Sequence, residues 1–390
     1  MSKESALEYQ ISKIEKLAQL KADEMEAKNY EKYHHMYDMV VQFLKTQDVL
    51  LYGGYAINEL MPKKDKIYKE NALPDIDIFS PASLKVAKAV VRMFKQRGIE
   101  IVNFSEALHP GTYKVYVQGI QIVDITGMSK RAYRKLHKRS VMGPSGLRVV
   151  DPQFLRLSLH MILSQSNNAD RWPKVFARLA KFYKHFPPTV CKTDDRDEKE
   201  LPTELVEGIY AHLRNTPYVV FGSKEIEAML GNRPVASTKV PWIQIVADRN
   251  VNQVANEIVN AVPTFSLKTS QVFGGDDFVS NHVFITFKGR KVIGIYSVDA
   301  CVSFNTWKGL KVATIHTMLR MYLSMMLSTY KHFEIMTDQL ECMVNALAVL
   351  QQTATSSKRK LLQQLVIECF GSFQGLITLK RERVLRMINK

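Results

Sequence analysis

The chain has 390 residues, 46% of them hydrophobic and 24% charged, which are globular values for a length that allows two or three domains. Its 54 lysines and arginines outnumber its 38 acidic residues, and the net charge of +16 favours a polyanionic partner, nucleic acid before an anionic membrane surface. We expect no signal peptide, because the N-terminus MSKESALEYQ lacks an apolar core, and no membrane span, because the most apolar stretch, from Met318, carries Arg320 and is too short.

The N-terminal segment, residues 1–47, is predicted to be helical. Apolar residues recur at helical spacing from Leu7 to Leu20 among lysines and glutamates. Two interpretations fit this pattern. The commoner one is an amphipathic helix packed on its own domain, and the other is an arm that binds a partner.

From residue 48 the pattern predicts an α/β or α+β unit with a mixed sheet. A short apolar run and a glycine pair precede a helix in VLLYGGYAINEL (49–60), and IDIFS (76–80) has strand character. An amphipathic helix ends at Gly98, and two further strands flank a turn at Gly119. Helices from about 150 to 186 and a polar linker at 192–204 follow.

The same order of patterns then starts again, which predicts a duplicated fold. YVVFGSKEIEAML (218–230) matches the first strand, glycine and helix, and three later matches follow in order at offsets of 163 to 170 residues. The predicted domains are N-terminal helices at 1–47, a first α/β domain with following helices at 48–190, a degenerate copy of it at 205–330, and basic C-terminal helices at 331–390.

The four cysteines are scattered along the chain. Because none forms a close pair, the sequence favours neither a disulfide framework nor a zinc site, and we expect reduced thiols in a cytosol-like compartment. The residues are Cys191, Cys301, Cys342 and Cys369.

Two aspartates alternate with apolar residues in PDIDIFS (74–80). Asp75 and Asp77 therefore point to one face of the strand, where their like charges repel unless a cation lies between them. A third acid, Asp124, lies on a strand predicted to be a neighbour, among apolar residues. Three acids from two adjacent strands can hold two Mg²⁺ ions, which act together in displacement at phosphorus. This hypothesis requires that no lysine or arginine fills the space between the acids.

Gly53 and Gly54 close a strand and open a helix. Glycine lets the backbone approach a ligand closely, and the N–H groups at a helix start favour phosphate. A bare glycine pair is weak evidence, but its order with the three aspartates strengthens it.

These motifs resemble the nucleotidyltransferase superfamily of the DNA polymerase β type. LLYGGYAINEL, PDIDIF and IVDI match its glycines, paired aspartates and third aspartate. Within it, the chain most resembles the poly(A) polymerase catalytic subunits of poxviruses and of giant DNA viruses such as the mimivirus–megavirus group. The long GGYAIN…PDIDIFS block, the RWPKVFARLAKFY helix from Arg171 and the degenerate second copy suggest that branch.

The resemblance implies an enzyme that adds AMP from ATP to RNA 3′ ends without a template, with two Mg²⁺ or Mn²⁺ ions. Asp75 and Asp77 would bind both ions, and Asp124 would bind the ion beside the RNA 3′-hydroxyl and help to deprotonate it. The implied partners are ATP, the RNA 3′ end, and a homodimer or accessory subunit, with no membrane. The implied location is the host cytoplasm, at the viral factory, with packaging in the virion as a further option.

Other candidate residues have two interpretations each. For nucleotide binding they are Gly53, Gly54, Asn58, Lys174 and Arg178, and Asn58 could instead cap or pack. For RNA binding they are Lys63, Lys64, Arg134, Lys135, Lys138 and Tyr133, the last as a ring that could stack on a base. The alternative is that these basic segments are simply solvated.

The second copy lacks all three acids. Trp242, Gln244 and Gly294 stand at the places of Asp75, Asp77 and Asp124, so we expect a structural or RNA-holding pseudo-domain. Two alternatives for the whole chain stay open. One is another transferase of the superfamily, such as a CCA- or uridylyl-adding enzyme or an oligonucleotide-signal synthase. The other is a catalytically dead RNA-binding scaffold.

Overall fold

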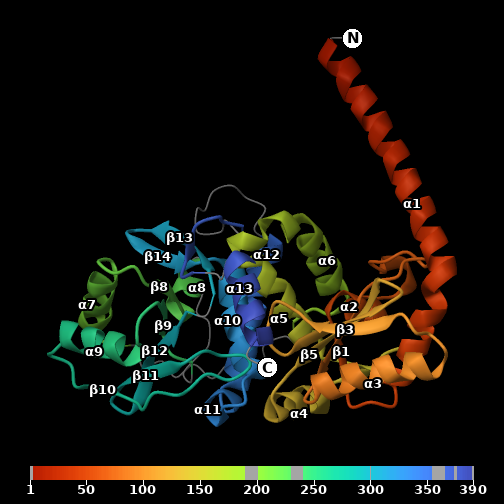
Figure 1. Cartoon of the computed structure of the whole chain (residues 1–390). Helices are drawn as coiled ribbons and strands as arrows, with labels where there is room; N and C mark the ends of the chain where they lie inside the picture. Colours follow the sequence, from red (N-terminus) through yellow and green to blue (C-terminus); the bar gives the residue numbers. More distant parts are fainter. Residues whose placement is uncertain are drawn as a thin grey trace. The chain divides into compact units, whose positions relative to one another are not determined.

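The computed structural model describes residues 3–188, 201–229, 240–298, 300–353, 365–372 and 376–388 (Figure 1). The chain divides into two compact units. Unit 1 comprises Met1–Met128, Ser140–Val150 and Lys380–Lys390, and unit 2 comprises Ser129–Arg139 and Asp151–Leu379. The domain boundaries expected from the sequence stay a prediction, and most of the linker expected at 192–204 lies outside the described residues.

Unit 1 is built on a seven-stranded mixed sheet in the order β3-β4-β5-β2-β1-β7-β6. The β2–β5 and β1–β7 pairs are parallel and the other pairs are antiparallel. The strands are β1 (Leu50–Tyr52), β2 (Ile76–Ser80), β3 (Val102–Glu106), β4 (Thr112–Val117), β5 (Ile120–Gly127), β6 (Val141–Met142) and β7 (Arg148–Val149).

Helix α3 (Ser83–Gln96) covers part of this sheet. Its buried face includes Val86, Val90 and Phe94, and the helix packs on β3, β4 and β5. The apolar period of 3.6 residues explains this one-sided burial. The other helices are α1 (Lys3–Leu44), α2 (Gly53–Leu60), the short η1 (Lys63–Asp65) and α13 (Leu376–Ile388), of which α13 begins in unit 2.

The two ends of α1 differ in burial. Met36, Val40 and Leu44 are buried, whereas Ile14 and Leu20 are 65% and 60% exposed. In Figure 1 the N-terminal part of α1 (red) extends away from the sheet of unit 1. The packed interpretation of residues 1–47 therefore holds for the last turns only, and the described earlier turns have the exposure that an arm would have.

Unit 2 contains an eight-stranded sheet in the order β10-β11-β12-β9-β8-β14-β13-β15. The β9–β12 and β8–β14 pairs are parallel, and the other pairs are antiparallel. The strands are β8 (Val219–Phe221), β9 (Ile243–Ala247), β10 (Leu267–Thr269), β11 (His282–Phe287), β12 (Arg290–Ser297), β13 (Val302–Trp307), β14 (Leu310–Ala313) and β15 (Cys369–Phe370).

The two sheets have the same topology, which confirms the predicted duplication. Along the first sheet from β3 to β6 and along the second from β10 to β13, the strands correspond one to one, with the same parallel and antiparallel pairs. Strand β15 is an addition to the second sheet. The register agrees as well: Tyr52 pairs with Asp77 in the first sheet, and Phe221 pairs with Gln244 in the second. The predicted mixed-sheet α/β class with helical additions is confirmed.

The helix after each copy begins with a matched cap. The Asp151 carboxylate accepts a hydrogen bond from the Phe154 N–H at the start of α5 (Pro152–Leu163), and the Thr314 hydroxyl accepts one from Thr317 at the start of α10 (Ile315–Leu327). Both helices lie in unit 2 and pack on each other. The remaining helices there are α4 (Lys130–Arg139), η2 (Ser166–Arg171), α6 (Trp172–His185), α7 (Thr203–Leu213), α8 (Ser223–Met229), α9 (Val251–Ala261), α11 (Lys331–Glu334) and α12 (Thr337–Thr353).

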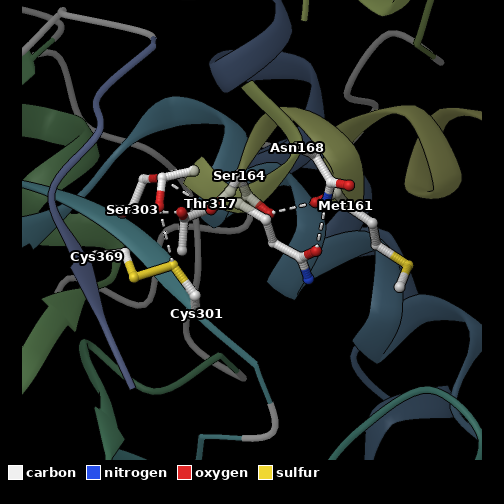
Figure 2. Close-up of a disulfide and its surroundings, with 9 residues drawn as sticks. Met161, Ser164, Asn168, Cys301, Ser303, Thr317 and Cys369 are labelled. Carbon is white, nitrogen blue, oxygen red and sulfur yellow. Dashed lines mark hydrogen bonds between the residues drawn. A yellow bond between two sulfur atoms is a disulfide. The ribbon is translucent and has the colours of Figure 1, made fainter. Parts of the chain in front are cut away.

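Cys301 and Cys369 form a disulfide, so the expectation of reduced thiols is wrong for this pair. The cysteines are 68 residues apart, but the β13–β15 pairing brings their backbones to a Cα–Cα distance of 5.5 Å. Figure 2 shows the bond beside Ser303, whose hydroxyl donates to the Ser164 carbonyl at 2.9 Å. Sequence spacing could not reveal this pair, because strand pairing creates it.

In the ranges that the structure describes, no helix combines the length and the apolar character needed to cross a bilayer.

Candidate active site

Gly53 lies directly against Asp77. The chain leaves buried β1 at Tyr52 and enters α2 at Gly53, which has a φ of +73°. A Cβ atom on Gly53 would lie 2.3 Å from Asp77 Oδ2, closer than any real Cβ contact. Only glycine fits this turn without displacing the carboxylate. The predicted glycine and aspartate motifs therefore meet, and Gly54 follows in the first turn of α2.

Asp77 and Asp124 are direct neighbours on parallel strands. The β2–β5 register pairs their Cα atoms, so their side chains lie on the same face of the sheet. Asp75 precedes β2 by one residue and is exposed. Burial and, after it, the charge of Asp75 raise the pKa of Tyr37 to about 12.

The two oxygens of Asp124 have different surroundings. Oδ2 accepts a hydrogen bond from Lys114 Nζ at 2.8 Å, whereas Oδ1 is buried and accepts no hydrogen bond from the described residues. A buried acceptor without a partner is costly, so Oδ1 has the character of a ligand position. It is an observation in favour of a cation at this carboxylate.

Lys114 is a basic residue that the sequence hypothesis did not include. It lies on β4, opposite Asp124 in the antiparallel β4–β5 register, whereas Asp77 approaches Asp124 from β2 on the other flank. Burial lowers the pKa of Lys114, but the hydrogen bond and charge of Asp124 outweigh it, so the pKa lies above its ordinary value. The metal-site hypothesis required that no lysine or arginine fill the space between the acids, and Lys114 meets this requirement only in part. Lys114 takes one oxygen of Asp124, from the side away from Asp77.

Four side chains lie next to one another across β4, β5, β2 and β1, and we call them the charged row: Lys114, Asp124, Asp77 and Tyr52. Tyr52 shares a hydrogen bond of 2.9 Å with the Thr126 hydroxyl. Burial and the charge of Asp77 raise the pKa of Tyr52 far above its ordinary value, so it stays protonated. The alternation in TYKVYV was the one sequence signal that could have placed Lys114 on this face.

The residues present suit a hard divalent cation. Within the described ranges, no group of three or more His, Cys, Asp or Glu side chains is arranged to hold a metal ion by itself. Magnesium, however, is usually bound by one or two carboxylates together with substrate phosphates. The neighbouring Asp77 and Asp124, and the unpartnered Asp124 Oδ1, fit such a site.

The equivalent row of the second copy holds no charge. It consists of Phe284, Gly294, Gln244 and Phe221, matched through the same strand pairings. A Cβ on Gly294 would lie 2.9 Å from the Tyr296 hydroxyl, and Gln244 Nε2 donates to the Tyr322 hydroxyl at 3.2 Å. Buried aromatic side chains therefore fill the place of the acids, and the predicted loss of the second site is confirmed for these residues.

Unit 2 also holds a buried carboxylate that the sequence patterns did not single out. Glu225 on α8 is buried, and the Tyr210 hydroxyl donates to its Oε1 at 2.6 Å. Burial raises the pKa of Glu225 to about 7. Within the described residues it belongs to no group of three or more His, Cys, Asp or Glu side chains that could hold a metal ion.

Asn58 stabilises the loop between α2 and β2. Its Oδ1 accepts hydrogen bonds from the N–H groups of Ile67 (3.0 Å) and Tyr68 (3.2 Å), and Lys66 Nζ donates to its carbonyl at 2.7 Å. These contacts favour the packing interpretation of Asn58 over nucleotide contact.

The same loop carries Lys63 and Lys64. Lys63 forms an exposed ion pair with Glu70, at 2.9 Å, which contributes little to stability. A cavity of about 650 Å³ lies beside this loop, between α1 and α2, and Tyr37, Tyr55 and Ile76 are among its lining residues. Because Ile76 and Asp77 alternate on β2, the cavity lies at the face opposite the charged row.

The other basic candidates belong to unit 2. On α4, Arg134 and Lys138 are exposed, Lys135 donates to the Ser328 carbonyl, and Tyr133 is only 4% exposed, which disfavours stacking on an RNA base. Burial lowers the pKa of Lys135. On α6, Lys174 and Arg178 are one turn apart. The side chain of Lys174 is exposed, and that of Arg178 is half-buried.

Comparisons with known proteins agree with the resemblance seen in the sequence. Residues 38–169 match the family model of the poly(A) polymerase catalytic subunit. A protein of Acanthamoeba polyphaga mimivirus named for this subunit is 26% identical over 274 residues, 65% of this chain and 45% of that protein. One of African swine fever virus is 26% identical over 145 residues, 37% of this chain and 30% of that protein.

The chain thus spans less than half the length of these curated relatives. Among solved structures, the Megavirus polyadenylate synthase matches with a TM-score of 0.75 and 17% identity, over 98% of this chain and 82% of that one. This likeness shows the fold, and the predicted resemblance to the viral poly(A) polymerase catalytic subunits is confirmed.

Proposed function

We propose that this chain is the catalytic part of a viral poly(A) polymerase, which adds AMP from ATP to RNA 3′ ends without a template. The family match at residues 38–169 contains Gly53, Asp75, Asp77 and Asp124. The single observation that carries the proposal is the pairing of Asp77 with Asp124 beside Gly53, with one buried Asp124 oxygen left for a ligand.

In the proposed reaction, the oxygen of the RNA 3′-hydroxyl attacks the α-phosphorus of ATP. A bond forms between that oxygen and phosphorus, the bond from phosphorus to the α,β-bridging oxygen breaks, and pyrophosphate leaves. The proton of the hydroxyl passes to the Asp124 carboxylate or to a water beside it. Most of the protein's contribution is positioning and charge.

Asp75, Asp77 and Asp124 would hold Mg²⁺ or Mn²⁺. When bound, two such ions stabilise both the attacking and the leaving oxygen of an in-line displacement at phosphorus. Gly53 keeps the α2 start open, so that backbone N–H groups of the first turn can face the triphosphate. Tyr52, protonated and hydrogen-bonded to Thr126, supports the β1 side of the row.

The net charge of +16 supports binding to RNA. In this proposal basic residues make phosphate contacts. Exposed Lys174 and half-buried Arg178 contact the triphosphate or the primer, and the exposed Lys63, Lys64, Arg134 and Lys138 contact the RNA along its length. Lys135 and Tyr133 are weaker candidates because their side chains are engaged or buried. A second chain in a homodimer, or an accessory subunit, would extend the RNA path. The host cytoplasm is the proposed site of action.

The test is incubation of the purified chain with a labelled RNA primer, Mg²⁺ or Mn²⁺, and each nucleoside triphosphate in turn. We expect long tails from ATP only. The double variant Asp75→Ala/Asp77→Ala should lose incorporation while RNA binding, measured by filter retention, remains. Asp338→Ala, at an exposed position on α12, is the matched control and should behave as the wild type.

Each other outcome points elsewhere. Incorporation of CMP or UMP would favour another transferase of the superfamily. Tail synthesis by the double variant would show that Asp75 and Asp77 are not needed for the reaction. RNA binding without incorporation of any nucleotide by the wild type would favour the dead scaffold.

A further inference from the structure

Lys114 is held in the charged row by two contacts. Its Nζ donates to Asp124 Oδ2 at 2.8 Å and to Gln121 Oε1 at 2.9 Å. The β4–β5 register places Lys114 directly opposite Asp124, so the ion pair follows from strand pairing. The side chain of Lys114 is 31% exposed and that of Asp124 is 14% exposed, so water weakens this pair less than a surface ion pair.

The second copy provides an internal comparison for this lysine. Phe284 of β11 lies opposite Gly294, as Lys114 of β4 lies opposite Asp124. The basic residue is therefore absent in the copy whose acids are absent, although the strands there pair in the same way. Strand pairing does not need a lysine at this place, so the charge of Lys114 is related to the acids.

The effect of this charge follows from simple electrostatics. Asp75, Asp77 and Asp124 carry three negative charges, and Lys114 compensates one of them. A divalent cation that binds Asp124 meets an ammonium group already hydrogen-bonded to the same carboxylate, and the two cations repel each other. The ion must therefore displace Lys114 from Oδ2, or bind through Oδ1 against its repulsion.

We propose that Lys114 is a built-in competitor of the divalent cation at Asp124. It holds this carboxylate in the absence of the ion and weakens ion binding there, so that the site fills fully only when ATP and RNA bring further oxygen ligands. The inference rests on the proposed function, because it takes the three acids as the metal ligands.

The test is a titration of the 390-residue chain with Mn²⁺ in the absence of ATP and RNA, in which electron paramagnetic resonance measures the free ion. Lys114→Met removes the charge and keeps the length of the side chain, and we expect it to bind Mn²⁺ about tenfold more tightly than the wild type. Lys114→Arg keeps the charge and should stay within about threefold of the wild type. Asp124→Asn should lose the affected site.

Unchanged or weaker Mn²⁺ binding by Lys114→Met would overturn the proposal, because it would make Lys114 a support that positions Asp124. If Lys114→Met does not fold, as judged by its thermal unfolding curve, Lys114→Gln is the second variant, since it is neutral and can still hydrogen-bond Asp124.

Failure of this inference and failure of the proposed function are distinguishable. Wild-type protein that makes A-tails while Lys114→Met binds Mn²⁺ no more tightly contradicts the role of Lys114 only. Tighter Mn²⁺ binding by Lys114→Met, in a protein that incorporates no AMP, supports the competition and contradicts the polymerase.

Discussion

Gln244 of β9 occupies the place that Asp77 occupies in β2. Each is paired with an aromatic residue of the preceding strand, Phe221 or Tyr52, and each faces the strand that carries Gly294 or Asp124. The exchange of an acid for an amide therefore occurs between strands that pair in the same register. Comparison of the two copies therefore shows that the strand pairing does not require the acidic residues, which only the first copy has.

We predict that acids cannot be restored to the second copy without loss of stability. Gly294→Asp would place a carboxylate among buried aromatic rings, with its Cβ 2.9 Å from the Tyr296 hydroxyl. We expect the free energy of unfolding to fall by about 3 kcal/mol or more, measured by urea unfolding. Introduced into the inactive Asp75→Ala/Asp77→Ala protein, the change should restore no AMP incorporation. Any restored incorporation would contradict the view that this site is closed.

Gly53→Ala should reduce AMP incorporation about 100-fold or more. The added methyl group would push Asp77 Oδ2 away, and displacements of about 1 Å at a catalytic group have effects of this size. Gly98→Ala is the matched control. Gly98 has a similar φ of +79°, but a Cβ there meets no atom within 4 Å.

Both alanine variants should therefore lose about 1 kcal/mol of stability from backbone strain. Only Gly53→Ala should lose activity. Equal activity of the two variants in the primer-extension assay would contradict the contact between Gly53 and Asp77.

The buried acid Glu225 should make stability depend on pH. Its pKa rises from 4.5 to about 7 in the folded protein because of burial. The folded state therefore keeps the proton to a higher pH than the unfolded state does. The contribution of Glu225 is fully present below about pH 4.5 and is lost as the pH rises through about 7.

Relative to Glu225→Gln, which cannot ionise, the wild type should lose roughly 3 kcal/mol of unfolding free energy between pH 4.5 and pH 8. Urea unfolding of both proteins across this range measures the difference. Parallel pH profiles for the two proteins would show that Glu225 keeps an ordinary pKa in the folded state.

The Cys301–Cys369 disulfide should contribute up to about 4 kcal/mol to stability, because it closes a loop of 68 residues in the unfolded chain. Peptide mapping without reductant should recover the linked pair. Cys301→Ser, Cys369→Ser and the double variant should each lower the unfolding free energy by the same amount, since each removes one bond. Additive losses would mean that the two sulfurs act separately.

Sequence could predict those parts of the site that depend on local patterns. The alternation in PDIDIFS put Asp77 on the strand face where it lies beside Asp124, and the glycine pair marked the turn into α2, whereas the orientation of Asp75 stays a prediction. The ordered repeats predicted the second sheet, since apolar strands and glycine turns are readable in a single segment.

Sequence could not predict what depends on register between distant strands. The contact of Lys114 with Asp124 needs the β4–β5 pairing, which contains an irregularity between Val115 and Tyr116. The disulfide needs β15 to join the edge of the second sheet. The exposed turns of α1 carry the same apolar spacing as a packed helix, so periodicity alone does not tell the two apart.

The division of the chain into units has a consequence for its synthesis. The chain passes between the two units at residues 128–129, 139–140, 150–151 and 379–380, so neither unit is one continuous piece. Unit 1, which holds the aspartates, includes Lys380–Lys390, and Arg386 there donates a hydrogen bond of 2.8 Å to the Leu108 carbonyl. The unit that holds the aspartates is therefore completed by residues that leave the ribosome after Asp151–Leu379 of unit 2.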